Sequence, residues 1–140
     1  MNTIQSYLKK RGISGPWQIA SESNQKFDRA VIIPAYSESE YLPKTLASLN
    51  ENNPSFLKDT LIVVVINNAE NSPEYILKNN QHCFELVSSP KYRFSLGIVD
   101  AFSNGLALLP KYAGVGLARK IGMDLALPHL TSPQSLIFCT

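Results

Sequence analysis

Two groups of side chains that could contact a nucleotide each follow a short apolar run. Their members are Pro34, Ala35, Tyr36 and Glu38 after the run 30–33, and Asn67 and Asn68 after the run 61–66. A nucleotide needs an amide or carboxylate at the base edge, a flat surface for the ring and close backbone approach at the ribose. These residue types can supply all three. The alternatives are a packed loop aromatic at Tyr36, a helix cap at Glu38 and ordinary turn residues for the asparagines.

A third group lies further along the chain. Gly114 and Gly116 open a segment with helical periodicity, and Arg119 lies in its first turns. Because glycines leave backbone N–H groups accessible and a guanidinium pairs well with anions, this segment could bind a base or a diphosphate. An ion pair with a structural carboxylate is the alternative for Arg119, and Lys120 can simply face solvent. Asp100 follows another apolar run, where it could approach the ribose or base or could hold a strand-end turn.

Apolar periodicity predicts the elements that position these residues. The predicted strands are 30–33, 61–66, 135–140 and a weaker one at 94–101, and the predicted helices lie within 1–11, 40–50, 72–88 and 114–127. Leu117, Ile121 and Leu125 would line one face of the last helix. Ser37 and Glu40 have the spacing of a capping box. Since Pro34 lacks an N–H group, strand pairing is expected to stop there.

Strands that alternate with helices predict an α/β fold, a three-layer sandwich with a mostly parallel sheet and right-handed crossovers. Ligands bind such folds at the carboxyl edge of the sheet, where the three groups would meet. We expect residues 1–26 to form a helical extension and connector, and residues 27–140 to form the domain. Because the chain stops on its last strand, we expect a truncated sheet whose exposed edge favours self-association.

Composition narrows the class of protein. A formal charge of +2, with no block of basic residues, argues against a nucleic-acid partner. No apolar stretch is long enough to span a bilayer and the N-terminus lacks a signal-peptide core, so we expect a cytoplasmic protein without a transmembrane segment. Cys83 and Cys139 lie far apart and are expected to be reduced thiols. The motifs of serine hydrolases, dinucleotide dehydrogenases and Walker-type ATPases do not occur.

Three segments together resemble the family 2 glycosyltransferases, which have the nucleotide-sugar-binding fold called GT-A. Residues 31–38 (VIIPAYSE) are similar to the family's first strand and Pro-x-Tyr/Phe-Asn-Glu turn, with Ser37 in place of Asn. Residues 62–72 (IVVVINNAENS) are similar to its strand ending in Val-Asp-Asp/Asn, with Asn67 in place of the frequent Asp. Residues 114–122 (GVGLARKIG) are similar to its Gly-x-x-x-Ala-Arg-Asn-x-Gly segment, with Lys120 in place of Asn.

The resemblance implies that residues 27–140 are part of a GT-A domain, a Rossmann-like half that binds a nucleoside diphosphate sugar of the UDP or GDP type. Ala35 and Tyr36 would contact base and ribose, Glu38 would accept a hydrogen bond from the ribose or order the loop, and Asn67 would read a base N–H. In the family an Asp-x-Asp motif follows the strand that corresponds to 136–140 and holds Mg²⁺ or Mn²⁺. The resemblance therefore implies that metal ligands and the catalytic base lie beyond Thr140.

The leading hypothesis is the donor-binding part of a glycosyltransferase that transfers a sugar to an acceptor hydroxyl, with this chain inactive alone. The alternative is a non-catalytic α/β module that binds a nucleotide or regulates a partner. A nucleotidyltransferase is a weaker third hypothesis, because a Gly-rich loop with a basic residue is missing after the first strand.

Overall fold

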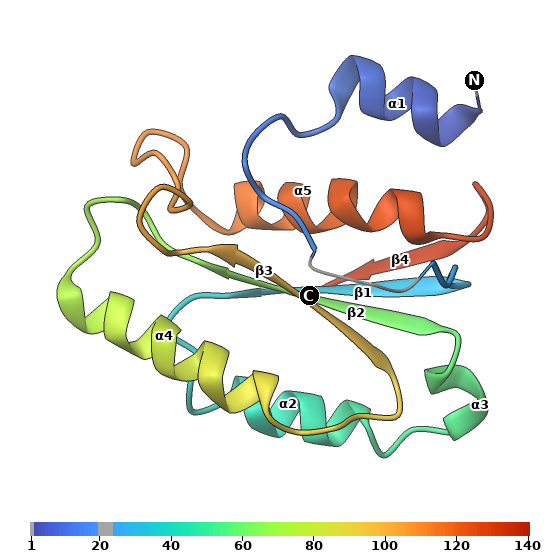
Figure 1. Ribbon diagram of the computed structural model, residues 1–140, viewed down its shortest axis with the longest axis horizontal. Coiled ribbons are helices and arrows are strands. Elements are labelled where there is room, and N and C mark those ends of the chain that lie inside the picture. Colours follow the sequence, from blue (N-terminus) through green and yellow to red (C-terminus); the bar gives the residue numbers. More distant parts are fainter. Residues whose placement is uncertain (1, 20–23) are drawn as a thin grey trace.

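The computed structural model describes residues 2–19 and 24–140 (Figure 1). Its elements are α1 (Thr3–Arg11), β1 (Arg29–Ala35), α2 (Leu42–Leu49), α3 (Pro54–Leu57), β2 (Thr60–Asn67), α4 (Glu74–Ser88), β3 (Ser95–Ala101), α5 (Val115–Ala126), a 3₁₀ turn η1 (Leu127–His129) and β4 (Leu136–Cys139). The described strands form one sheet in the order β3-β2-β1-β4, and each neighbouring pair is parallel. The predicted α/β class with a parallel, Rossmann-like sheet is confirmed.

Helices cover both faces of this sheet. In Figure 1, α2 and α4 lie below it, α5 lies above it, and α1 lies outside α5. Val63 and Val65 of β2 face α5, whereas Val64 and Ile66 face α2 and α4. Every residue of β2 is buried, as expected for a central strand with helices on both faces.

Helix α5 packs on the sheet through smaller residues than predicted. Ala118, Ile121 and Gly122 are buried, whereas Leu117 and Leu125 are only half-buried. A Cβ atom on Gly122 would lie 2.5 Å from Cγ2 of Ile32, so the helix can approach β1 only because this position has no side chain. The prediction that Ile121 lies on the buried face of α5 is confirmed. The face that contacts the sheet is, however, rotated away from Leu117 and Leu125 toward Ala118 and Gly122.

Pro34 does not end the pairing of β1, which corrects the prediction. Pro34 and Ala35 stay in register with Val65 and Ile66 of β2. The Ile32 carbonyl accepts a hydrogen bond from the Thr140 N–H, so β1 residues of even number direct their polar groups toward β4. The N–H that proline lacks would therefore point toward β4, where the ladder has already ended at Cys139. The hydrogen bonds between β1 and β2 do not need it.

The loop between β1 and α2 also differs from the prediction. Helix α2 begins at Leu42 and its N-cap residue, Tyr41, makes no side-chain capping bond, so the Ser37–Glu40 capping box is not formed. Ser37 instead adopts a left-handed backbone conformation with φ of 54°, and its N–H donates to Oδ1 of Asn80. The reason is tertiary: a buried amide on α4 holds the loop in a turn before the helix can start.

The N-terminal segment is attached to α5 mainly through a buried carboxylate. Helix α1 has no buried residue, and Asn2 and Gln5 cap its start. Asp124 accepts hydrogen bonds from the Tyr7 hydroxyl, the Ile13 N–H and Nζ of Lys120 at 2.8–2.9 Å. Lys120 thus forms an ion pair with Asp124 and does not simply face solvent. Of the described helices, none is both long and apolar enough to cross a membrane.

Candidate functional site

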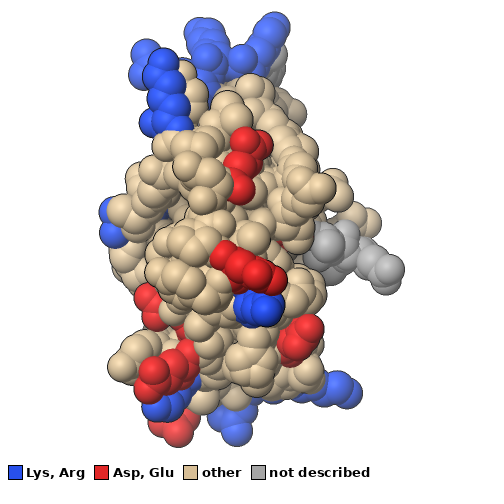
Figure 2. All heavy atoms as spheres, turned by 90° about the vertical axis from the view of Figure 1, so that its left-hand side faces the viewer, with Lys and Arg blue, Asp and Glu red and all other residues tan. Residues whose placement is uncertain are grey.

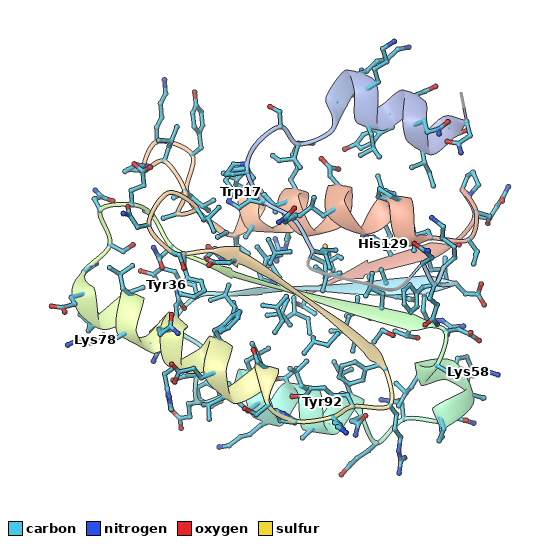
Figure 3. All side chains as sticks on the ribbon, in the orientation of Figure 1. Trp17, Tyr36, Lys58, Lys78, Tyr92 and His129 are labelled. Atoms are coloured by element: carbon cyan, nitrogen blue, oxygen red, sulfur yellow. The ribbon has the colours of Figure 1, made fainter. Side chains whose placement is uncertain are left out.

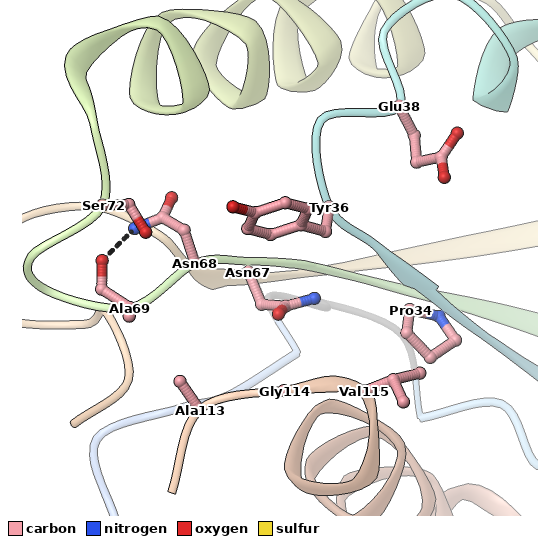
Figure 4. Close-up of a pocket in the computed structure, with 10 residues that line it drawn as sticks. All are labelled: Pro34, Tyr36, Glu38, Asn67, Asn68, Ala69, Ser72, Ala113, Gly114 and Val115. Carbon is pink, nitrogen blue, oxygen red and sulfur yellow. Dashed lines mark hydrogen bonds between the residues drawn. The ribbon is translucent and has the colours of Figure 1, made fainter. Parts of the chain in front are cut away.

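A cavity of about 470 Å³ opens at the carboxyl edge of β1 and β2, beside the first residues of α5 (Figure 4). Its lining residues are Pro34, Tyr36, Glu38, Asn67, Asn68, Ala69, Ser72, Ala113, Gly114 and Val115. Five of them were predicted from the sequence. Figure 3 places Tyr36 at this end of the sheet, and Figure 4 shows its ring on one side of Asn67, with Gly114 on the other. The structure therefore brings the two strand-end groups and the start of α5 together.

Four other predicted residues do not line this cavity. Ala35 is fully buried in β1 and lines a smaller neighbouring cavity of about 240 Å³, and Gly116 is the second residue of α5. Asp100 accepts hydrogen bonds from the Phe102 and Ser103 N–H groups, which is the strand-end turn that the sequence left open. Arg119 donates from Nε to the Thr140 carbonyl at 2.9 Å and does not enter the cavity.

Asn67 turns one side of its amide toward the cavity. Its Nδ2 donates to the carbonyls of Ala35 and Val65 at 3.1 and 3.2 Å. Both partners can only accept, so the amide nitrogen must face them and the oxygen must point into the cavity. Asn67 is only 4% exposed, yet its Oδ1 has no hydrogen-bond partner among residues 2–19 and 24–140 and is not sealed from the cavity. It is a preorganised acceptor.

Asn68 has a different role, because both ends of its amide are already used. Its Nδ2 donates to the Ala69 carbonyl at 2.9 Å, and its Oδ1 accepts from Asn80 Nδ2 at 2.8 Å. The same Nδ2 of Asn80 also donates to the Asn67 carbonyl at 3.0 Å. Asn68 therefore holds the wall of the cavity in place and offers a ligand little beyond its surface.

Asn80 joins three segments of the site, and the sequence analysis did not identify it. It is fully buried on α4. Its Nδ2 donates to the Asn67 carbonyl and to Oδ1 of Asn68, and its Oδ1 accepts from the Ser37 N–H. The neighbouring Asn79 accepts from the Ser39 N–H at 3.1 Å. A signal was present, because an Asn that lies between Ile76 and Cys83 on the predicted apolar face of a helix must find buried partners.

Glu38 is the only charged side chain among the described residues that line the cavity. It lines both this cavity and the smaller one beside it, and the ion pairs of the described residues do not include it. Its charge and, more strongly, burial raise the pKa of the Cys83 thiol to about 11, so Cys83 stays protonated at neutral pH. Figure 2 shows this edge of the molecule with Lys and Arg mostly at its upper and lower ends.

The start of α5 supplies backbone donors. Gly114 precedes the helix at φ of 142°, a conformation that favours glycine, and both Gly114 and Val115 line the cavity. The first N–H groups of a helix have no carbonyl partner within the helix. In α5, the Ala118 N–H donates to the carbonyl of Gly114, the residue just before the helix. These donors can bind an anion.

The metal ion that the resemblance implies does not fit the residues present. In the ranges 2–19 and 24–140, no group of three or more His, Cys, Asp or Glu side chains is arranged to hold a metal ion. Comparisons of the chain with protein-family models, with curated proteins and with solved structures each gave no match. The parallel sheet with helices on both faces is consistent with a Rossmann-like α/β fold, and the glycosyltransferase family remains a prediction from the sequence.

Proposed function

We propose that the chain is the donor-nucleotide-binding part of a glycosyltransferase and that its cavity takes the nucleoside of a nucleoside diphosphate sugar. The observation that carries the proposal is the free Oδ1 of Asn67, an acceptor on a buried residue that opens to the cavity and that nothing in the described chain satisfies. Because the amide is held in one direction, a ligand that donates to this oxygen gains a hydrogen bond with little reorganisation of the protein. The volume of about 470 Å³ is within the range of small-molecule sites.

The fixed direction of the Asn67 amide favours the binding of bases that can donate a hydrogen bond to its oxygen. Uracil and guanine carry a ring N–H that can donate to Oδ1, whereas the matching ring nitrogens of cytosine and adenine only accept. Tyr36, half-exposed above Asn67, offers the flat surface for a base, and Glu38 can accept from ribose hydroxyls. The donors at the start of α5 are then available for a phosphate.

Calorimetric titration with UDP, GDP, CDP and ADP tests the binding half of the proposal. We expect UDP or GDP to bind more tightly than CDP and ADP by about tenfold, which corresponds to one hydrogen bond to the Asn67 Oδ1. Asn67→Ala should remove that preference, and Tyr36→Ala should weaken every nucleotide. Asn104→Ala is the matched control, because Asn104 is exposed on another loop. Equal affinity for all four nucleotides would overturn the proposal.

The transferase half needs a separate test, because the resemblance alone supports it. Incubation with radiolabelled UDP- and GDP-sugars should give no transfer by the 140-residue chain, since the resemblance places the metal ligands and the base outside it. Fusing the chain to the remainder of a family 2 enzyme should restore transfer. Tight nucleotide binding without transfer in any such fusion would favour the non-catalytic binding module.

A further inference from the structure

Strand β4 leaves one of its two edges without a partner among the described residues. The order β3-β2-β1-β4 puts it at the end of the sheet, and it pairs only with β1. Leu136 and Thr140 donate to the Asp28 and Ile32 carbonyls, so even-numbered residues of β4 direct their N–H and C=O groups toward β1. By alternation, Ile137 and Cys139 direct theirs outward, as a template for another strand.

Two large apolar side chains lie along the same edge. Leu136 and Phe138 are 58% and 51% exposed. Phe138 is in register with Val31, which packs with the core on the α2 side, whereas Ile137 packs with the core on the α5 side. Leu136 and Phe138 therefore share the α2 face of the sheet, away from α1. Natural edge strands are usually protected by charge or proline, and residues 135–140 contain neither.

We propose that β4 pairs with β4 of a second copy of this chain, antiparallel about a two-fold axis, to form a continuous eight-stranded sheet. The argument for a second copy is the self-complementarity of the strand. With Ile137 opposite Ile137 of the second copy, the outward N–H and C=O groups of both residues bond each other. Leu136 then lies opposite Phe138 of the second copy in the non-hydrogen-bonded pairs, where side chains are closest. The two-fold axis repeats this apolar contact.

This arrangement differs from an open assembly in a way that can be measured. Pairing β4 with the opposite edge, β3, would be heterologous and would generate filaments of increasing size. Pairing β4 with itself is isologous, because it uses the outer β4 edge of each copy, and it closes at two copies. The proposal does not depend on the proposed function, because none of the β4 residues 136–139 lines the nucleotide cavity.

Light scattering coupled to gel filtration under reducing conditions tests the pairing. At a concentration on the order of 100 μM, the chain should have twice its mass of 15.5 kDa. Cys139→Pro should give monomer, because it removes an outward N–H group and leaves the bonds to β1 intact. Phe138→Lys should do the same by placing a charge at the contact. Tyr75→Lys, at a 71% exposed site on α4, is the control and should stay dimeric.

Circular dichroism on each variant would show that it is folded, so that a change in mass reports on assembly. A monomeric wild-type chain would overturn the proposal. So would a dimer that survives both β4 substitutions, or species that grow beyond two copies.

Discussion

The Nε atom of Arg119 donates to the carbonyl oxygen of Thr140 at 2.9 Å. In the parallel ladder between β1 and β4, that carbonyl would next accept from residue 34 of β1, but Pro34 has no N–H to give. An arginine on α5 thus completes the ladder where a proline interrupts it. This bond also explains why Arg119 lies outside the cavity that Pro34 lines.

Arg119→Met tests that structural role against the nucleotide contact that the resemblance implies. Loss of one exposed hydrogen bond should lower the free energy of unfolding by about 0.5–1.5 kcal/mol. Amide hydrogen exchange at Phe138 and Thr140 should become faster, while the Kd for UDP changes by less than about threefold. A tenfold weaker Kd with unchanged exchange would instead assign Arg119 to the ligand.

Asn67→Asp introduces the residue that is frequent in the family that the chain resembles, yet we expect it to destabilise this chain. A carboxylate oxygen would replace Nδ2 against the carbonyls of Ala35 and Val65, costing about 1–3 kcal/mol at neutral pH. Burial and the facing carbonyl oxygens would raise the pKa of the new carboxyl in the folded state above its unfolded value. The lost stability should therefore return as the pH falls through the folded pKa.

Urea unfolding of this variant across the acidic and neutral range measures the effect, with Asn104→Asp as the exposed control. A loss of stability that is the same at every pH would contradict the fixed amide direction.

Asn80→Leu should be among the most destabilising polar substitutions in the chain. It would leave the Ser37 N–H, the Asn67 carbonyl and the Asn68 Oδ1 without their partner, for a cost of about 3 kcal/mol or more. Asn79→Leu is the matched comparison on the same helix. It removes one bond to the Ser39 N–H, so about 0.5–1.5 kcal/mol is expected. If chemical unfolding gave the same loss of unfolding free energy for both variants, the hydrogen bonds of Asn80 would stabilise the fold no more than the single bond of Asn79.

Two glycines in α5 should respond in opposite ways to alanine. In Gly122→Ala the new Cβ would lie 2.5 Å from Cγ2 of Ile32 and 2.9 Å from Cγ2 of Val65, so overpacking should cost about 1–3 kcal/mol. At Gly116 a Cβ meets nothing within 4 Å, and alanine should stabilise the helix by up to about 1 kcal/mol. Melting temperatures that move in the same direction would contradict this packing.

The Lys120–Asp124 pair should make attachment of the N-terminal segment sensitive to alkaline pH. The hydrogen bond to Asp124 is the main cause that raises the pKa of Lys120 above 10.5, although the side chain is partly exposed. A raised lysine pKa gives stability that is present below the unfolded pKa and lost as the pH rises through the folded one. Wild type should therefore approach Lys120→Met in stability at high pH.

Limited proteolysis of the segment around Ile13 gives a second measurement on the same two proteins. Cleavage should be faster in Lys120→Met at neutral pH. A stability difference that does not shrink in alkali would show that the ion pair is not its source.

The sequence predicted the fold well because its strongest signals are local. The apolar run at 61–66 lies in β2, the segment 94–101 contains β3, and the predicted helices at 72–88 and 114–127 match α4 and α5 within two residues. A central strand between two helical layers must be apolar on both faces, and that requirement is visible without a structure.

The site was only partly predictable, because its geometry depends on contacts between distant segments. The carboxyl-edge rule placed Tyr36 and Asn67 together correctly. It could not show that Asn80 would take the Ser37 N–H in place of a helix cap, or that Thr140 would draw Arg119 away from the cavity. Both outcomes depend on which carbonyl or N–H another element leaves free, and this information appears only after the chain has folded.

The amide network behind the cavity also determines how the site responds to its surroundings. Asn67, Asn68 and Asn80 do not titrate, so protons neither make nor break the bonds that fix the cavity wall. Between about pH 5 and 9 these hydrogen bonds should therefore keep the cavity wall in one arrangement. A wall held together by amides alone is indifferent to the acidity of its surroundings.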